Sequence, residues 1–240
     1  RHNDPGHAAE LLSRASTVGR RFLVTEGVFS MDGDAAPLAA LADVADRTDA
    51  LIYLDDAHGA FVAGATGRGS PEAAGVAQER FLYMGALGKA LGCQGGFIVG
   101  PEVLIHYLRN RARPFIYSTA LAVPVAAAAV QALTVLSQEP QRRDVLRERV
   151  MRLRDRLEAL PGQVEGSSLR ASHILPVMLG ETARAVAVAG RLRERGCWAP
   201  AIRPPTVPEG TARLRLSMTA LHSEADIDAL GEALEDALSG

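Results

Sequence analysis

Hydrophobic residues in the first half of the chain gather in short continuous runs. The runs lie at residues 22–25, 51–54, 81–84 and 96–99. Segments with helical spacing separate them: Pro37 opens one that continues to about residue 46, and Pro101 opens another. Strands that are apolar at every position and alternate with helices are typical of a parallel α/β sheet that is covered on both faces.

The second half has a different pattern, in which charged amphipathic helices are mixed with short strands. Helices are predicted at 124–137, 141–160 and 183–195, and strands at 173–179, 197–202 and 213–218. The helix at 141–160 carries arginine and glutamate on one face and leucine and valine on the other. This order of elements predicts a smaller α+β unit.

Two features complete the predicted organisation. Ser223 and Asp226 have the spacing of a capping box, which predicts that a last helix begins there. We place a domain boundary near residue 135, so that 1–135 is the later part of a large domain and 136–240 is a small domain. The chain starts in mid-pattern without a methionine, and we expect it to be part of a longer one.

Composition narrows the class of protein. The chain has 240 residues, of which 48% are hydrophobic, and its formal net charge is -2. This charge gives no electrostatic reason to expect a nucleic acid or an anionic membrane as partner. The apolar stretch at 121–136 is too short to span a bilayer, and the polar first residues are not a signal peptide. Two cysteines form neither a disulfide framework nor a metal cluster, so we expect no metal and a cytoplasmic location.

Chemically useful side chains follow the predicted strands. Ser30 comes shortly after the first strand, Asp55 and His58 follow the second, and Lys89 follows the third within the glycine-rich segment GALGKALGCQGG. Ligands of open α/β sheets bind beyond the carboxyl ends of the strands. We therefore expect a carboxylate, an imidazole and an amine in one polar site.

This set of side chains is what a pyridoxal 5'-phosphate (PLP) site requires. Such a site uses a lysine for covalent attachment and an acid beside the pyridinium nitrogen. Nearly all other basic residues of the chain are arginines, which cannot form that bond, whereas a partly buried lysine can act as nucleophile or base. The residues thus predict a PLP enzyme with Lys89 and Asp55 at its centre.

Several segments carry a family resemblance that covers the whole chain. They are TEGVFSMDGD, DDAHG followed by GRG, GALGKALGCQGG, YLRNRARPFIYSTAL and GCWAPAIRPPTVPEGTARLRLSMTALH. In these segments the chain resembles the α-oxoamine synthases, which are PLP enzymes of fold type I. The resemblance implies part of a fold-type I large domain, with a mostly parallel sheet and helices on both faces, and a small α+β domain.

The resemblance also implies roles for the residues at the strand ends. Lys89 matches the lysine that binds the cofactor and later acts as base. Asp55 matches the partner of the pyridinium nitrogen, and His58 matches a histidine near the phenolic oxygen that also helps the acyl chemistry. Ser30 matches a polar contact to the cofactor.

Further roles concern the substrate and a second subunit. Arg215 matches the arginine that holds the amino-acid carboxylate, and we expect Thr206 to contact the substrate as well. Ser118 and Thr119 match a loop that reaches the cofactor phosphate of the neighbouring subunit, which implies a homodimer.

The implied reaction is a condensation of an amino acid with an acyl thioester and loss of carbon dioxide. The last segment favours L-alanine with a pimeloyl thioester, carried by coenzyme A or a carrier protein, in the biotin pathway. A glycine-using member of the family and a truncated, non-catalytic dimerising remnant are the alternatives. Two departures from the family pattern are Ala86, where threonine is usual three residues before the lysine, and the absent N-terminal third.

Other residues have structural interpretations. Asp56 is interpreted as a structural or supporting neighbour of Asp55. Arg213 shares a strand face with Arg215, so that one of the two is structural. The GRG segment at 67–69 is a weak signal for a phosphate cradle, and Cys93 is interpreted as a packing residue.

Overall fold

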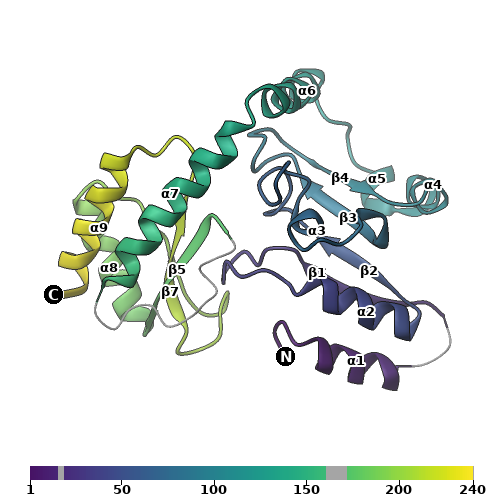
Figure 1. The fold of residues 1–240 in the computed structure, drawn as a ribbon, viewed down its shortest axis with the longest axis horizontal. Helices are drawn as coiled ribbons and strands as arrows, with labels where there is room; N and C mark the ends of the chain where they lie inside the picture. The colour runs from purple at the N-terminus through teal and green to yellow at the C-terminus, as the bar shows by residue number, and fades with distance from the viewer. Residues whose placement is uncertain (16–18, 161–171, 240) are drawn as a thin grey trace. The chain divides into compact units, whose positions relative to one another are not determined.

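The computed structural model describes residues 1–15, 19–160 and 172–239, which form two compact units (Figure 1). Unit 1 consists of Arg1–Val28 and Ala35–Pro140, and unit 2 consists of Phe29–Asp34 and Gln141–Gly240. The domain boundary near residue 135 stays a prediction.

Unit 1 contains a four-stranded sheet in the order β1-β2-β3-β4. The strands are β1 (Arg21–Glu26), β2 (Ala50–Asp55), β3 (Phe81–Ala86) and β4 (Gly96–Val99). These four strands were predicted, and each lies within two residues of its expected bounds. The first three are parallel, with Glu26, Asp55 and Met84 aligned across them.

The fourth strand makes the sheet mostly rather than entirely parallel, as the resemblance implied, because β4 runs antiparallel to β3. Only residues 87–95 connect the two strands, and a parallel crossover needs a dozen or more residues. The short connection returns the chain at the same end of the sheet, where Ala86 pairs with Gly96. Both ends of the loop that carries Lys89 are therefore anchored at one sheet edge.

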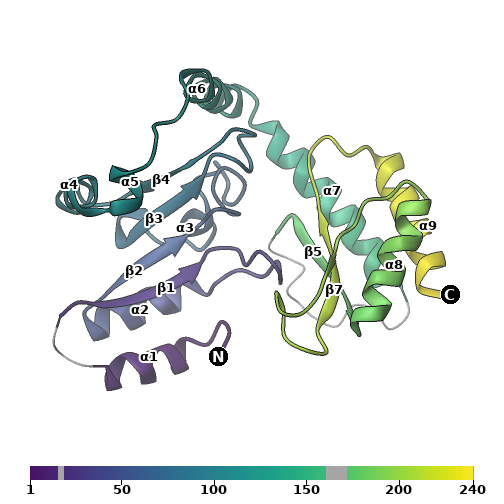
Figure 2. The same cartoon turned by 180° about the vertical axis from the view of Figure 1, so that it is seen from behind.

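The helices of unit 1 are mostly short. They are α1 (Pro5–Arg14), α2 (Leu38–Thr48), α3 (Ser70–Ala73), the 3-10 turn η1 (Gln78–Arg80), α4 (Glu102–Arg111), α5 (Arg113–Ile116) and α6 (Val123–Gln138). Helix α2 buries Leu38, Leu41 and Val44, and α1 lies beside it (Figures 1 and 2). Pro37 is the residue just before α2, which agrees with the predicted helix start. Within the described ranges, no helix is long and apolar enough to cross a membrane.

The described residues cover the two faces of β1 unequally. Leu23 is buried, but its neighbours Phe22 and Val24 are 52% and 69% exposed. Because side chains alternate along a strand, Phe22 and Val24 share one face, and the described residues leave that face open to solvent. An end strand with exposed apolar residues is a site of unwanted association.

We expect the substitution Val24→Lys to reduce concentration-dependent self-association of the chain. A charge on an exposed end strand opposes edge-to-edge pairing without removing a buried contact. Light scattering over a concentration series measures the effect, with exposed Val186→Lys on the outer side of a unit 2 helix as the control. Equal association of wild type and Val24→Lys would contradict the expectation.

Unit 2 contains an antiparallel sheet in the order β5-β7-β6. Its elements are β5 (Ile174–Gly180), β6 (Ala201–Ile202), β7 (Ala212–Ser217), α7 (Gln141–Glu158), α8 (Thr182–Glu194) and α9 (Glu224–Ser239). Helices α7, α8 and α9 lie on one face of the sheet (Figures 1 and 2). This confirms an α+β organisation for the second half.

One strand of unit 2 is much shorter than expected. The sequence predicted a strand at 197–202, but only Ala201–Ile202 pairs with β7. The Cys197 N–H still bonds to the Leu192 carbonyl at the end of α8 (2.9 Å), and Pro200 has no N–H to donate to a ladder. The chain therefore turns after α8, and its strand pairing with β7 begins only at Ala201.

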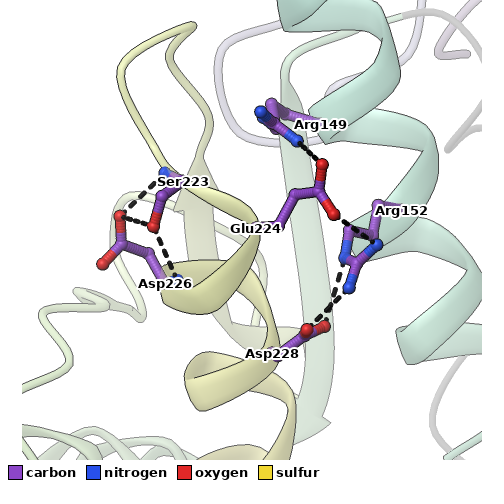
Figure 3. Close-up of polar contacts among 6 residues, drawn as sticks. All are labelled: Arg149, Arg152, Ser223, Glu224, Asp226 and Asp228. Carbon is purple, nitrogen blue, oxygen red and sulfur yellow. Dashed lines mark hydrogen bonds and ion pairs between the residues drawn. The ribbon is translucent and has the colours of Figure 1, made fainter.

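The core of unit 2 joins the three helices to the sheet. Fully buried side chains come from every layer: Leu153 and Leu157 on α7, Leu192 on α8, Leu234 on α9, and Leu175 and Leu214 on the strands. The predicted capping box is confirmed, because the Asp226 carboxylate accepts from the Ser223 N–H (2.7 Å) and Ser223 Oγ accepts from the Asp226 N–H (3.1 Å) (Figure 3).

Arginines of α7 pair with carboxylates of α9 (Figure 3). The Arg152 guanidinium donates to both oxygens of Asp228 (3.1 and 2.6 Å), and Arg156 donates to Asp228 Oδ1 (2.9 Å). Glu224 pairs with Arg149 and Arg152 (2.9 and 3.1 Å). The hydrogen bonds from Arg152 and Arg156 lower the pKa of Asp228 below its usual range.

Asp228→Asn is expected to lower the free energy of unfolding of unit 2 modestly at neutral pH. It should also make this free energy less dependent on pH in the acid range. A carboxyl group whose pKa is lower in the folded state stabilises that state above its ordinary pKa. This contribution is lost as the pH falls through about 4 and lower. Urea unfolding from pH 7 down to pH 3 measures it, and added salt should shrink it by screening.

Glu232→Gln is the matched control for this experiment. Glu232 is an exposed carboxylate on the same helix, and the described residues offer it no ion pair. Its replacement should leave the pH dependence unchanged. A loss equal to that of Asp228→Asn would show that general helix charge, rather than the pairing with α7, is responsible.

Candidate active site

Asp55 ends β2, in the middle of the parallel part of the sheet. Its carbonyl oxygen accepts from the Gly27 N–H after β1 (2.8 Å), and the next N–H, of Asp56, donates to Met84 on β3 (2.8 Å). The half-buried Asp55 carboxylate accepts from the Ala57 N–H through Oδ1 (3.0 Å). Within the described chain Oδ2 makes no hydrogen bond, which leaves an acceptor for a ligand.

His58 lies on the turn that follows Asp55 and Asp56. The turn is closed by two hydrogen bonds to the Asp56 carbonyl, from the N–H groups of Gly59 (3.1 Å) and Ala60 (2.8 Å). The imidazole is half-buried. The turn therefore keeps His58 at the sheet edge where β2 ends.

Lys89 lies on the loop that joins β3 to β4. Backbone hydrogen bonds close this loop on itself, from Leu87 N–H to the Gly95 carbonyl (2.9 Å) and from Cys93 N–H to the Leu87 carbonyl (2.9 Å). Lys89 is exposed and is the only lysine in the sequence. Because β2 and β3 are parallel, this loop leaves the sheet at the same edge as Asp55.

These three residues supply complementary chemistry at one sheet edge. Lys89 offers an amine for a carbonyl, Asp55 offers a carboxylate oxygen for a cationic ring nitrogen, and His58 offers a ring that donates or accepts a proton. The residues present fit the PLP site that the sequence predicted. Ala86 ends β3 in this region and has no hydroxyl to add.

Ser118 and Thr119 follow α5 and are exposed. The Ser118 hydroxyl donates to the Pro114 carbonyl one turn earlier. The described contacts of these two residues do not join them to Lys89, Asp55 or His58. Their predicted role concerned a neighbouring subunit, and it stays a prediction.

Unit 2 brings together two other predicted residues that are far apart in the sequence. Arg215 on β7 donates from Nε to the Ser30 carbonyl (2.5 Å) and from Nη1 to Ser217 Oγ (3.0 Å). Burial lowers the pKa of Arg215. Since Nη2 has no hydrogen-bond partner in the described part of unit 2, part of the guanidinium is available to a carboxylate.

Arg213 makes the structural contacts on the same strand face. It is 4% exposed, and Nη1 donates to Asp32 Oδ1 (2.6 Å) and to the Met31 carbonyl (3.1 Å). Its Nε also donates to the Thr211 carbonyl (3.0 Å). This nearly buried arginine fixes residues 31–32 to β7, whereas Arg215 is only half-buried. The contrast supports Arg215 as the ligand-binding member of the pair.

Thr206 is exposed in the loop between β6 and β7. Its N–H donates to the Arg203 carbonyl (3.0 Å), and this bond closes a turn. The structure does not join its side chain to Arg215 by a hydrogen bond among the described residues. Its predicted substrate contact therefore stays a prediction.

Sequence reasoning missed a buried cluster around Asp56. The Asp56 carboxylate accepts from the Ser70 N–H, the Ser70 hydroxyl and the Tyr83 hydroxyl. The GRG segment had been considered only as a weak phosphate cradle, but it leads into Ser70 at the start of α3. Two adjacent aspartates at a strand end, followed by a Gly-Ser pair, are the signal that could have indicated this pairing.

The chain belongs to the aminotransferase class I and II family, whose family model matches residues 1–234. The resemblance found in the sequence is thereby confirmed at the level of this family. Its curated relatives include the 8-amino-7-oxononanoate synthases of Anaeromyxobacter dehalogenans and Chromobacterium violaceum, which are 48% and 45% identical to it. These matches cover 100% and 96% of this chain, but only 59% and 58% of the relatives.

Solved structures confirm the fold. Serine palmitoyltransferase from S. paucimobilis, determined with a bound PLP–myriocin aldimine, superposes with a TM-score of 0.93 and 31% identity over 99% of this chain and 59% of that one. The 8-amino-7-oxononanoate synthase of Francisella tularensis gives a TM-score of 0.81 at 26% identity, covering 97% and 66%. The fold-type I architecture predicted from the sequence is therefore correct.

Proposed function

We propose that the protein is a PLP-dependent acyltransferase that makes 8-amino-7-oxononanoate for biotin biosynthesis. L-alanine and a pimeloyl thioester would give the product, carbon dioxide and a free thiol. The observation that carries this proposal is the position of Lys89, Asp55 and His58 at one sheet edge, in a chain 48% identical to a curated synthase of this name. The chain spans about 59% of that relative's length.

PLP would supply an electron sink that stabilises a carbanion at the α-carbon of the amino acid. Asp55 would accept a hydrogen bond from the ring nitrogen and keep it protonated. Lys89 would attach the cofactor and, once displaced by the amino acid, remove the α-proton. His58 would donate a hydrogen bond to the oxygen that becomes negative when the thioester carbonyl is attacked.

Residues of unit 2 would hold the amino-acid substrate. Arg215 retains donors beyond its bond to Ser30, and an arginine pairs well with a carboxylate. Thr206 would add a polar contact, and Ser30 would contact the cofactor. Ser118 and Thr119 would reach the cofactor phosphate of a second subunit in a cytoplasmic homodimer.

The test is a product assay that also separates the alternatives. The complete gene product is incubated with PLP, pimeloyl-CoA and one of L-alanine, glycine or L-serine, and the products are identified by mass spectrometry. Release of 8-amino-7-oxononanoate with alanine alone supports the proposal. Turnover with glycine favours the glycine-using alternative, and no turnover with any amino acid favours a non-catalytic remnant.

Serine is included because of the structural comparison. The serine palmitoyltransferase structures share the fold at 31% identity, so that an enzyme acting on serine is the second candidate. The identities of 48% and 45% to two curated oxononanoate synthases favour alanine. A palmitoyl-CoA reaction with serine would reverse that order.

A further inference from the structure

The carboxylate of Asp56 is completely buried at the end of β2. Its exposed fraction is 0%, and three donors surround it: Ser70 N–H at 2.8 Å from Oδ2, Tyr83 hydroxyl at 2.9 Å from Oδ2, and Ser70 hydroxyl at 2.5 Å from Oδ1. These donors come from the start of α3 and from the middle of β3. One carboxylate thus joins two elements to the strand that carries Asp55.

Three glycines allow the backbone to close around this carboxylate. A Cβ atom on Gly27 or Gly59 would lie 2.1 Å from Asp56 Oδ1, and one on Gly69 would lie 2.2 Å from Oδ2. Gly69 also has φ +96°, which other residues rarely adopt. The end of β1, the turn that carries His58 and the entry to α3 all approach the same carboxylate.

Asp56 also lies between the two predicted catalytic groups along the chain. Its own N–H is bonded to Met84, and its carbonyl accepts the N–H groups of Gly59 and Ala60 that close the His58 turn. A side chain fixed by three hydrogen bonds therefore sets the backbone on both sides. Asp55 is one residue before it, and His58 is two residues after it.

We propose that Asp56 is a positioning residue, which through Ser70 and Tyr83 holds the Asp55 carboxylate and the His58 imidazole in their working directions. This inference rests on the proposed function, in which Asp55 and His58 face PLP. It assigns to Asp56, Ser70 and Tyr83 a supporting role behind the residues that touch the cofactor. Residues that orient the ligands of a metal ion change affinity or activity about 10- to 100-fold when they are removed, and we expect an effect of similar size here.

Hydrogen bonding, rather than the charge of Asp56, carries this role. Burial raises the pKa of Asp56 even though Ser70 and Tyr83 donate to it, so that ionisation of this buried group is less favourable than in water. An asparagine could keep the contacts: its oxygen would accept from the Ser70 N–H and Tyr83, and its amide would donate to Ser70 Oγ after the hydroxyl turns. Asp56→Asn therefore separates geometry from charge.

The test compares Asp56→Ala, Asp56→Asn and Tyr83→Phe in the complete gene product. The first readout is the side-chain rotamer of Asp55 and of His58, measured by NMR scalar couplings without cofactor, with His222 of unit 2 as internal reference. We expect the rotamer populations of both residues to shift in Asp56→Ala and Tyr83→Phe and to stay close to wild type in Asp56→Asn. A purely structural residue would lower stability but leave these rotamers of the folded protein unchanged.

The second readout is the dissociation constant of PLP. It should rise about 10- to 100-fold in Asp56→Ala and about tenfold in Tyr83→Phe, in the range expected for orienting partners. Tyr83→Phe keeps its ring beside Phe97 (centroids 6.2 Å apart), so it carries the test if Asp56→Ala does not fold. Glu72→Gln is the matched control, because this half-buried carboxylate holds Thr66 and Arg68 of the same loop without reaching β2.

The outcomes separate this inference from the proposed function. Unchanged rotamers and unchanged PLP affinity in folded Asp56→Ala or Tyr83→Phe would overturn the positioning role while the PLP function stands. Equal losses in Asp56→Asn and Asp56→Ala would also overturn it, because charge would then be the cause. If wild type binds no PLP, the proposed function fails, but shifted rotamers of Asp55 and His58 would still support the positioning role of Asp56.

Discussion

Lys89→Ala is expected to abolish covalent attachment of PLP to the chain and to slow the condensation by at least about 10³-fold, since both nucleophile and base are lost. Lys89 is the sole lysine of the 240-residue sequence, so within these residues an adduct on a lysine can only be on Lys89. The measurement is borohydride reduction after incubation with PLP, followed by proteolysis and mass spectrometry. Wild type should carry the reduced cofactor on the peptide that contains Lys89.

Lys89→Arg is the control for this experiment. Arginine keeps the positive charge but cannot form the covalent bond, so we expect it to lose the adduct as completely as alanine. An adduct that survives equally in both variants would lie on another amine. That result would contradict Lys89 as the site of attachment, whatever the catalytic activity of the chain.

Leu214→Ala is expected to lower the free energy of unfolding of unit 2 by about 2–5 kcal/mol, the range for a buried leucine that leaves a cavity. Leu214 is 0% exposed in the central strand β7, where it pairs with Val177 on β5 and Ala201 on β6. Urea unfolding followed by Trp198 fluorescence measures the loss. Trp198 is the single tryptophan of the sequence and lies in unit 2.

Leu221→Ala is the matched control, since Leu221 is 85% exposed. We expect it to change the free energy of unfolding by less than about 0.5 kcal/mol. A loss of similar size in both variants would show that Leu214 is not at the centre of the core. Leu214→Val should fall between the two, because it removes fewer buried atoms.

Much of the fold could be predicted because its signals are local. The four strands of unit 1 are continuous apolar runs, and Ser223 with Asp226 marks the start of α9 through contacts within one turn. The direction of β4 and the length of β6 could not be predicted in this way. Both depend on how the chain returns to a sheet, through the short 87–95 connection and through Pro200.

The candidate site shows the same division. The sequence determined which chemistry is available, because Lys89, Asp55 and His58 follow apolar runs whose carboxyl ends meet at one edge of a parallel sheet. Only the tertiary structure decided how the remaining polar residues divide their work. Arg213 and Arg215 look equivalent on one strand face. Arg213 nevertheless bonds to Asp32 and Met31, 181 and 182 residues away, and Arg215 bonds to Ser30, 185 residues away.

The two adjacent aspartates show why the sequence alone does not assign the role of each polar residue. Periodicity and spacing place Asp55 and Asp56 together at the end of β2, but they do not say which carboxylate faces solvent or ligand. That choice depends on three glycines and on donors from Ser70 and Tyr83, which lie 14 and 27 residues away. A buried carboxylate requires hydrogen bonds from distant segments, so its role is decided only when those segments meet.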